Sequence, residues 1–188
     1  AGNVSVGMGS LSSITTVNTN TAIGHKAMEQ ATGASNTAVG SHAMQVATAS
    51  NTTAIGTSCL SALTSGSDNT GIGYQCMDAN TTGGNNTAAG TGALGQNTTE
   101  SNNTAFGYIA LTANTTGSLN VAVGSKSLDA NTTGAGNTAV GDDALSENTT
   151  ANNNTAIGHK SFFTNSTGTN NTGVGLYSGL SNTTGSRN

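Results

Sequence analysis

The sequence has little charge, few aromatic residues and neither tryptophan nor proline. Charged residues make up 6 % of the chain and aromatic residues 3 %, whereas charged residues alone are about a quarter of an ordinary globular domain. With only four Lys and Arg residues in total, no basic patch can neutralise a phosphate backbone, so we expect no nucleic-acid partner. Apolar runs long enough to cross a bilayer are also lacking, and we therefore expect no membrane insertion.

The low charge also argues against disorder. Disordered polar chains usually carry a high net charge and lack periodicity. This chain of 188 residues has a formal net charge of only −4, and its apolar residues return at regular intervals. We therefore expect an ordered protein, built mainly from Asn, Thr, Gly, Ser and Ala.

One glycine recurs along the whole chain, each time preceded by a small residue and then an apolar one. These glycines lie at positions 7, 24, 40, 56, 73, 90, 107, 124, 141, 158 and 175. The steps between them are 17, 16 and 16 residues, followed by seven steps of 17. So constant a period indicates a solenoid in which each repeat forms one coil. We number coil positions from this glycine, which is position 0.

Turn residues separate the apolar ones throughout each repeat. Gly and Asn come every few residues and no 3.6-residue periodicity is present, which favours short strands and tight turns over helices. We predict an all-β fold, a parallel β-solenoid or β-roll of eleven coils of ~17 residues, with two short strands in each coil.

The repeats are interpreted as a single domain over residues 1–188. The first four coils form a variant block, because at position +7 they lack the Asn that the seven later coils have there. The pattern is cut inside a twelfth repeat, at Asn188. The residues at position +7 of the variant block are Ile14, Ala31, Ala47 and Leu63.

Two apolar columns are expected to form the core. The column at position +4 holds Leu, Met or Phe in every coil except at Gly179. The column at position −1 is mostly β-branched, as stacked parallel strands prefer. Its members are Val6, Ile23, Val39, Ile55, Ile72, Ala89, Phe106, Val123, Val140, Ile157 and Val174.

Position −2 holds only Ser, Ala or Gly. Because side chains alternate across a strand, this column faces away from the apolar column at position −1. A face so uniformly small indicates close approach of another layer, either the far wall of a flat coil or a second chain. We favour a second chain, since a thin core is often supplemented by oligomerisation. Self-association is therefore expected, as a homotrimer or as an end-to-end filament.

Asn occupies position −4 in every coil except the fourth, where Thr52 replaces it. A second Asn follows at position +7 in the seven later coils. Stacked Asn side chains can bond along their column and to turn backbone. The pattern predicts structural ladders and not a binding site.

Cys59 and Cys76 both lie at position +3, in neighbouring coils. Parallel stacking would bring their Cα atoms to about 4.8 Å, within the range of a disulfide. A disulfide is one interpretation. The other is a pair of buried thiols that stand in for Ala, because the column is otherwise small.

Positions +1 and +2, just after the glycine, are chemically diverse. Exposed diversity on a rigid scaffold is where recognition usually lies, although a solvated turn would carry similar residues. The candidate recognition residues are His25, Lys26, His42, Tyr74, Tyr108, Lys126, His159, Lys160 and Tyr177.

The pattern gives no support for catalysis. A nucleophile needs a base and an orienting group placed once, whereas hydroxyl groups recur in every coil. We expect no enzyme activity, no metal and no cofactor. His159 lies one coil above Asp142, but a single such pair at a surface contributes little.

The repeat unit is similar to those of known fibrous proteins. Asn137-Thr138-Ala139-Val140-Gly141, followed by Asn148-Thr149-Thr150, resembles the tandem repeats of phage tail fibres and large bacterial surface proteins. The segment 154–158 also resembles the Asn-Ser-Val-Ala-Ile-Gly motif of trimeric autotransporter adhesin heads. These resemblances imply a parallel β-roll, a trimer and an extracellular location, in a cell-surface fibre or a virion tail fibre.

The expected function is a structural or adhesive segment of an extracellular fibre or filament. Such a segment would present positions +1 and +2 to a surface, for example to a cell-surface glycan. Ice binding is the alternative, because Thr stands at position −3 in nine of the eleven coils and a regular Thr rank in a low-charge solenoid resembles ice-binding proteins. Thermal hysteresis would discriminate the two.

Overall fold

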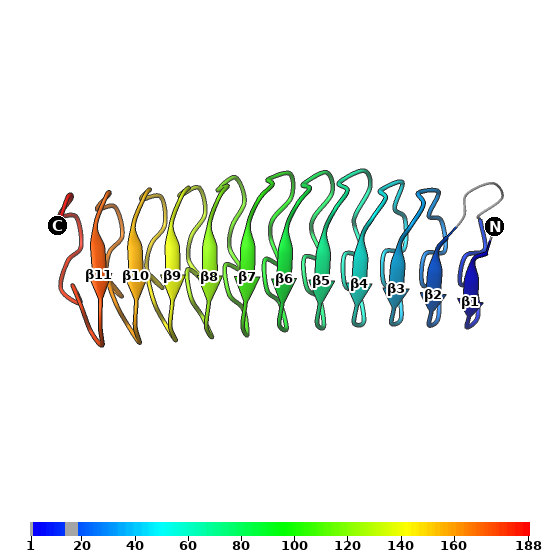
Figure 1. The fold of residues 1–188 in the computed structure, drawn as a ribbon, viewed down its shortest axis with the longest axis horizontal. Coiled ribbons are helices and arrows are strands. Elements are labelled where there is room, and N and C mark those ends of the chain that lie inside the picture. Colours follow the sequence, from blue (N-terminus) through cyan, green and yellow to red (C-terminus); the bar gives the residue numbers. More distant parts are fainter. Residues whose placement is uncertain (1, 14–18) are drawn as a thin grey trace.

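The computed structural model describes residues 2–13 and 19–188, and within them all regular secondary structure is β. Eleven strands of three residues each lie side by side along a rod (Figure 1). The strands are β1 (Val4–Val6), β2 (Thr21–Ile23), β3 (Thr37–Val39), β4 (Thr53–Ile55), β5 (Thr70–Ile72), β6 (Thr87–Ala89), β7 (Thr104–Phe106), β8 (Val121–Val123), β9 (Thr138–Val140), β10 (Thr155–Ile157) and β11 (Thr172–Val174).

The strands form one parallel sheet in chain order, from β1 to β11. The register places equivalent positions opposite each other, so that Ala105 pairs with Ala122 and Phe106 with Val123. The predicted parallel β-solenoid is confirmed. Neighbouring strands lie about 4.8 Å apart, so the eleven strands span roughly 50 Å along the rod. Strands β1 and β11 lie at its opposite ends (Figure 1).

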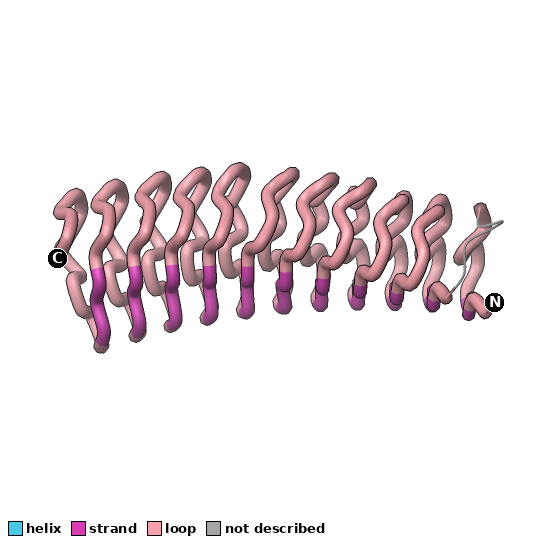
Figure 2. The backbone as a smooth tube through the Cα atoms, turned by 45° about the horizontal axis from the view of Figure 1, so that its top comes forward, coloured by secondary structure: helices cyan, strands magenta, loops and turns pink. Residues whose placement is uncertain are grey.

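Within residues 2–13 and 19–188 each coil holds one strand, and the prediction of two strands per coil is wrong there. The strands lie on one side of the coils, and turns and loops make up the rest of the described backbone (Figure 2). The turn side is nevertheless laddered, because the amide of Met28 donates to the carbonyl of Ala43 at 3.0 Å. Its backbone visits the left-handed region at +2 and +4, as Ile109 and Leu111 show with φ of 46° and 53°, and this breaks up any second strand.

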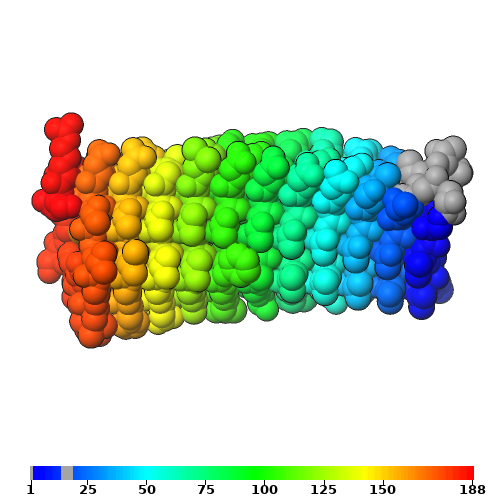
Figure 3. Space-filling view, in the orientation of Figure 1, coloured from blue at the N-terminus to red at the C-terminus, as the bar shows by residue number. Residues whose placement is uncertain are grey.

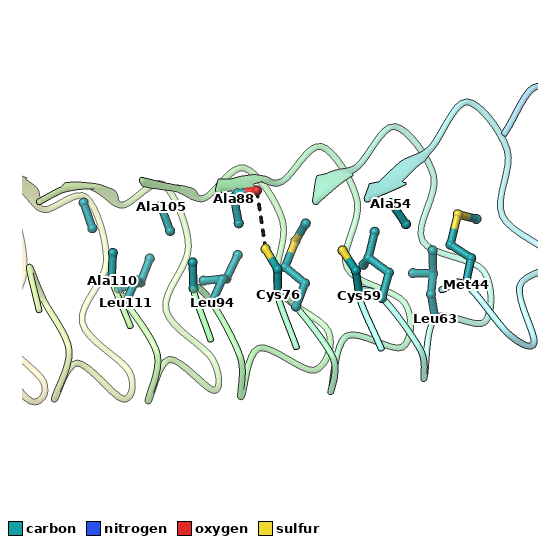
Figure 4. Packing of buried hydrophobic residues seen from close by; sticks show 14 of the residues in the cluster. Met44, Ala54, Cys59, Leu63, Cys76, Ala88, Leu94, Ala105, Ala110 and Leu111 are labelled. Atoms are coloured by element: carbon teal, nitrogen blue, oxygen red, sulfur yellow. Dashed lines mark hydrogen bonds between the residues drawn. The ribbon is translucent and has the colours of Figure 1, made fainter. Parts of the chain in front are cut away.

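The core lies between the inward side of the sheet and the turn side (Figure 4). Ala88 and Ala105 point from their strands toward Leu94 and Leu111, and all four are fully buried. The column at position −2 therefore faces the far wall of its own coil. Our preference for a second chain against this column is wrong, because the Ala residues of this column from Ala22 to Ala156 are already fully buried within the single chain.

The column at position −1 lies outside this core, contrary to prediction. Ile72 is 44 % exposed and Val174 is 68 % exposed, whereas the column at position +4 is buried from Met28 to Phe162. The prediction that positions −2 and −1 face opposite sides of the sheet is confirmed, but the inward side is that of position −2 and the outward side that of position −1. Ala fills the inward position because the Leu and Met side chains of the opposite wall already occupy the interior.

Departures in size inside the core are compensated by a neighbour. A methyl group at Gly71 would lie 2.7 Å from the Sγ atom of Cys59, so the thiol takes the place of an Ala methyl. Phe162 fills the last coil in the same way, since a Cβ at Gly173 would lie 2.5 Å from its ring and one at Gly179 would also collide with it. The exception at Gly179 is thus filled from the preceding coil.

The repeated glycine itself is fixed by two constraints. Gly24 has φ of 137°, a conformation that L side chains rarely adopt. An added Cβ there would also lie 2.5 Å from the carbonyl oxygen of Gly40 in the next coil. The chain therefore turns from the strand into positions +1 and +2 at a place where only glycine can stack.

Candidate functional site: the outer sheet face and the edge

The outer sheet face consists of the side chains at positions −3 and −1 of the eleven strands. Two ranks run along it, Thr at position −3 and mostly Val or Ile at position −1. Thr70 and Thr87 are half-buried, while Ile55, Ile72 and Ile157 are 38–44 % exposed. Side chains form continuous rows along the rod (Figure 3).

No charged residue interrupts this face. The chain has four basic and eight acidic residues, and none of them lies in a strand. The outer positions hold nine Thr residues, and all others are apolar. Solvated surfaces usually mix charged side chains among apolar ones, whereas this face carries only Thr and apolar side chains over its whole length.

The largest and the smallest side chains of the outer apolar rank are direct neighbours. Ala89 of β6 pairs in register with Phe106 of β7, and every other member of the rank is Val or Ile. The same kind of compensation occurs in the core, at Gly71 with Cys59. Phe106 is 42 % exposed, so the largest side chain of this rank lies at the surface of the single chain.

The edge consists of positions +1 and +2 of each coil, which follow the outer sheet face across the glycine. Its backbone is laddered, since the amide of Gly92 donates to the carbonyl of Tyr74 at 3.0 Å and that of Ile109 to Thr91 at 2.9 Å. Side chains of successive coils are therefore held in register. The candidate recognition residues fall into three groups along this edge.

The first group lies in the second and third coils. The rings of His25 and His42 meet edge to face with centroids 5.2 Å apart. Lys26 Nζ lies 3.3 Å from Glu29 Oε1, and Gln45 Nε2 donates to Glu29 Oε2 at 2.7 Å. The bond from Gln45, together with Lys26, lowers the pKa of Glu29.

The second group lies in the ninth to eleventh coils and contains the predicted pair. His159 Nδ1 lies 3.3 Å from Asp142 Oδ2, and its ring meets that of Tyr177 at 5.6 Å. Lys160 Nζ lies 3.8 Å from Asp143 Oδ2. These contacts join side chains one coil apart at the surface, where each contributes little to stability.

Tyr74 and Tyr108 form the third group, in the middle of the rod. They are 52 % and 55 % exposed. Ring contacts in the described part of the chain are confined to the two pairs at His25–His42 and His159–Tyr177, so neither tyrosine packs on another ring. Lys126, also exposed, follows one coil beyond Tyr108.

Cys59 and Cys76 are free thiols and fully buried. The Sγ atom of Cys76 lies 3.4 Å from the carbonyl oxygen of Ala88 and donates to it (Figure 4). Contact with Cys76 and burial raise the pKa of the Cys59 thiol. The structure matches the interpretation of two thiols that replace Ala in the core.

Both Asn columns form buried ladders, as predicted. The amide of Asn120 donates to Asn103 Oδ1 at 3.0 Å, and Asn120 Nδ2 donates to the carbonyl of Gly134 at 2.8 Å. In the second column Asn114 Nδ2 donates to Asn97 Oδ1 at 3.0 Å. These side chains hold the turns of successive coils together, and they are buried except at the two ends of the rod, where Asn3 and Asn182 lie.

Within residues 2–13 and 19–188, no three His, Cys, Asp or Glu side chains are grouped as a metal ion would require. The same residues enclose no pocket. A helix able to span a membrane is not found among them either.

The sequence pattern identified the edge and the Thr rank at position −3 of the outer sheet face, but it placed the apolar rank at position −1 in the core. Diversity at positions +1 and +2 was a usable signal for the edge. The sequence signal for the whole face is the absence of charge at positions −3 and −1. Comparison with protein-family models, with curated proteins and with solved structures finds no match to this chain.

Proposed function

We propose that the chain is a rigid segment of an extracellular fibre in which copies pack side by side through the outer sheet face. The edge then stays at the rim of the assembly and is displayed to a surface. One observation carries this proposal: Thr and apolar side chains cover the sheet face over all eleven strands without a charge. Exposed apolar patches of this kind mark interaction surfaces.

The size of the face suits a specific interface. Ten spacings of about 4.8 Å by three residues of about 3.3 Å give roughly 500 Å² per chain. Two such faces together reach about 1,000 Å², the lower size of a specific interface. Ala89 beside Phe106 supports packing as well, since paired large and small residues keep the volume of a packed layer constant.

Three copies are the expected number, on the resemblance to trimeric adhesin heads. A trimer would place the three outer sheet faces around a common axis and leave three edges outside. End-to-end stacking into a filament adds length to the same arrangement and needs no further side-chain face. An extracellular location, in a cell-surface or virion tail fibre, belongs to the same proposal.

Sedimentation equilibrium tests the assembly. The chain of 18.2 kDa is expected to sediment as a multiple of that mass, near three. Ile72→Lys and Ile157→Lys place a charge on the outer sheet face and should shift the protein to monomer with an unchanged circular dichroism spectrum. Thr116→Lys, at an exposed turn, is the matched control and should leave the assembly intact.

Two results would contradict this proposal. A wild-type monomer at high concentration would remove the packed face. Assembly that survives both Ile→Lys variants would place the interface elsewhere on the rod. Either outcome leaves the solenoid fold itself untouched.

A second candidate, ice binding, is favoured by one observation of its own. The Thr rank lies on the outer sheet face and in register beside the apolar rank, so hydroxyl and methyl groups repeat together on a flat surface. Measurable thermal hysteresis of a monomer, abolished by Thr87→Lys, would establish this function and displace fibre packing. Absence of hysteresis would remove it.

A further inference from the structure

In the middle of the edge, position +1 alternates between a large and a small side chain in three successive coils. In the sixth coil positions +1 and +2 are Thr91 and Gly92, while the coils on both sides carry Tyr74 and Tyr108 at position +1. Both tyrosines are about half exposed and neither packs on another ring of the described chain. Two aromatic side chains thus flank one coil of small residues.

The spacing of the two tyrosines follows from the ladder. Tyr74, Thr91 and Tyr108 are held in register by the hydrogen bonds of Gly92 and Ile109 to the preceding coils. Two coil spacings place the tyrosines about 9.6 Å apart. That exceeds the 4.5–7 Å typical of stacked rings, but a third ring between them would lie about 4.8 Å from each.

The surroundings decide which kind of ring fits. Positions +1 to +3 of the fifth, sixth and seventh coils carry no charge, so a phosphate finds no basic side chain there and a cation finds no carboxylate. The polar groups present are the phenols, the Thr91 hydroxyl and the Gln75 amide, all of them exposed. Neutral hydroxyl and amide groups beside aromatic faces match a sugar ring, which has C–H faces and hydroxyls at its rim.

We propose that Tyr74 and Tyr108 bind one pyranose ring of a neutral glycan between them, above Thr91 and Gly92. Each tyrosine packs on one C–H face of the sugar, and Thr91 and Gln75 bond its hydroxyls. The open edge lets a polymer enter and leave on either side. This inference rests on the proposed display of the edge and names the class of ligand that the edge takes.

Saturation-transfer NMR with cellotetraose, chitotetraose and mannotetraose tests the site. Ring C–H protons of at least one of these oligosaccharides should receive saturation from the wild-type protein. Tyr74→Ala and Tyr108→Ala should each weaken its binding by about tenfold, since one of two ring contacts is lost. Tyr177→Ala is the matched control, because that tyrosine is equally exposed but already contacts His159.

Thr91→Tyr separates the paired site from binding by single tyrosines. Position +1 accepts Tyr in the coils on both sides, so the variant should fold, and its new ring should fill the gap and abolish binding. Stronger binding by Thr91→Tyr would overturn the proposal. So would an equal loss in Tyr177→Ala, or no saturation transfer from any of the three probes.

Sedimentation of the same samples keeps this inference apart from the proposed fibre. The tyrosine variants should assemble like the wild type, because the edge lies beside the outer sheet face and not on it. Assembly without any sugar binding would overturn the glycan site alone. Sugar binding by a wild-type monomer would overturn the packed face and leave the glycan site standing.

Discussion

The two faces of the sheet differ in the size and burial of their side chains, although each strand has only three residues. The inward middle residue is never larger than Ala or Ser in all eleven strands, whereas the outer apolar rank ranges from Ala89 to Phe106. Inward Ala residues are fully buried and the outer rank is mostly exposed. Uniform size inside reflects a wall a few ångströms away, and wider variation outside reflects a surface without such a wall in the single chain.

On both faces of the sheet a large side chain lies beside a small one. Inside, Gly71 makes room for Cys59 and Gly173 for Phe162. Outside, Ala89 stands beside Phe106 with no wall of its own chain opposite. We interpret the outer pair as the imprint of packing against other copies.

The largest expected difference between the faces is in stability. Ala122→Leu adds three carbon atoms to an interior closed by Leu111 and Leu128, so we expect a loss of about 3 kcal/mol in the free energy of unfolding. Val123→Leu, one residue further and on the outer face, should change it by less than about 1 kcal/mol. Urea unfolding followed by circular dichroism measures both, under conditions where the protein is monomeric.

Equal losses for the two variants would mean that the faces do not differ. A monomer in which Val123→Leu costs more than Ala122→Leu would reverse the assignment of inside and outside. The dependence of the free energy of unfolding on urea concentration should be the same for both variants. A change in this slope would indicate a change in the surface exposed on unfolding and not in stability alone.

Much of this architecture could be predicted from the sequence, because it rests on local chemistry. The glycine period gives the coils, and Asn at −4 and +7 gives the ladders. Which face is inside could not be predicted, since alternation shows only that Ala122 and Val123 point apart. The usual preference of β-branched residues for cores then favoured Val123, and the thin interior decided otherwise.

The turn side of the coil was also beyond prediction. Leu111 and its equivalents adopt left-handed φ values near 50°, where Gly and Asn are the usual residues. Leu therefore gave no local signal. At +2, Gly9, Gly92 and Asp143 are residues that favour the left-handed conformation they adopt. The edge was predicted as a site, and the grouping of His159 with Asp142 followed from the period alone.

The Asn ladder is expected to have an effect of intermediate size. Asn120→Ala removes the acceptor of the Asn137 amide and one of the two donors to the Gly134 carbonyl. The buried amide is left unpaired, while the carbonyl keeps its bond from Asn131 Nδ2. We expect a loss of about 2 kcal/mol in the free energy of unfolding. Asn120→Thr should lose less, because Thr52 already occupies this column and accepts from the Asn69 amide at 3.4 Å. Urea unfolding of both variants checks the order, and an order reversed would contradict the ladder as a source of stability.

The smallest effect tests compensation inside the core, by a double-mutant cycle at Gly71 and Cys59. Gly71→Ala alone brings a methyl group to 2.7 Å from the Cys59 Sγ atom, and Cys59→Ala alone leaves a small void. We expect each single change to cost about 1 kcal/mol. Together they recreate the Ala pair of neighbouring coils, so the double variant should unfold at nearly the wild-type urea concentration. A coupling energy of about 2 kcal/mol, the sum of the two single losses, would show that the two residues share one space. Simple additivity would mean that they do not, and would remove the analogy from which we infer that Ala89 and Phe106 pack against another chain.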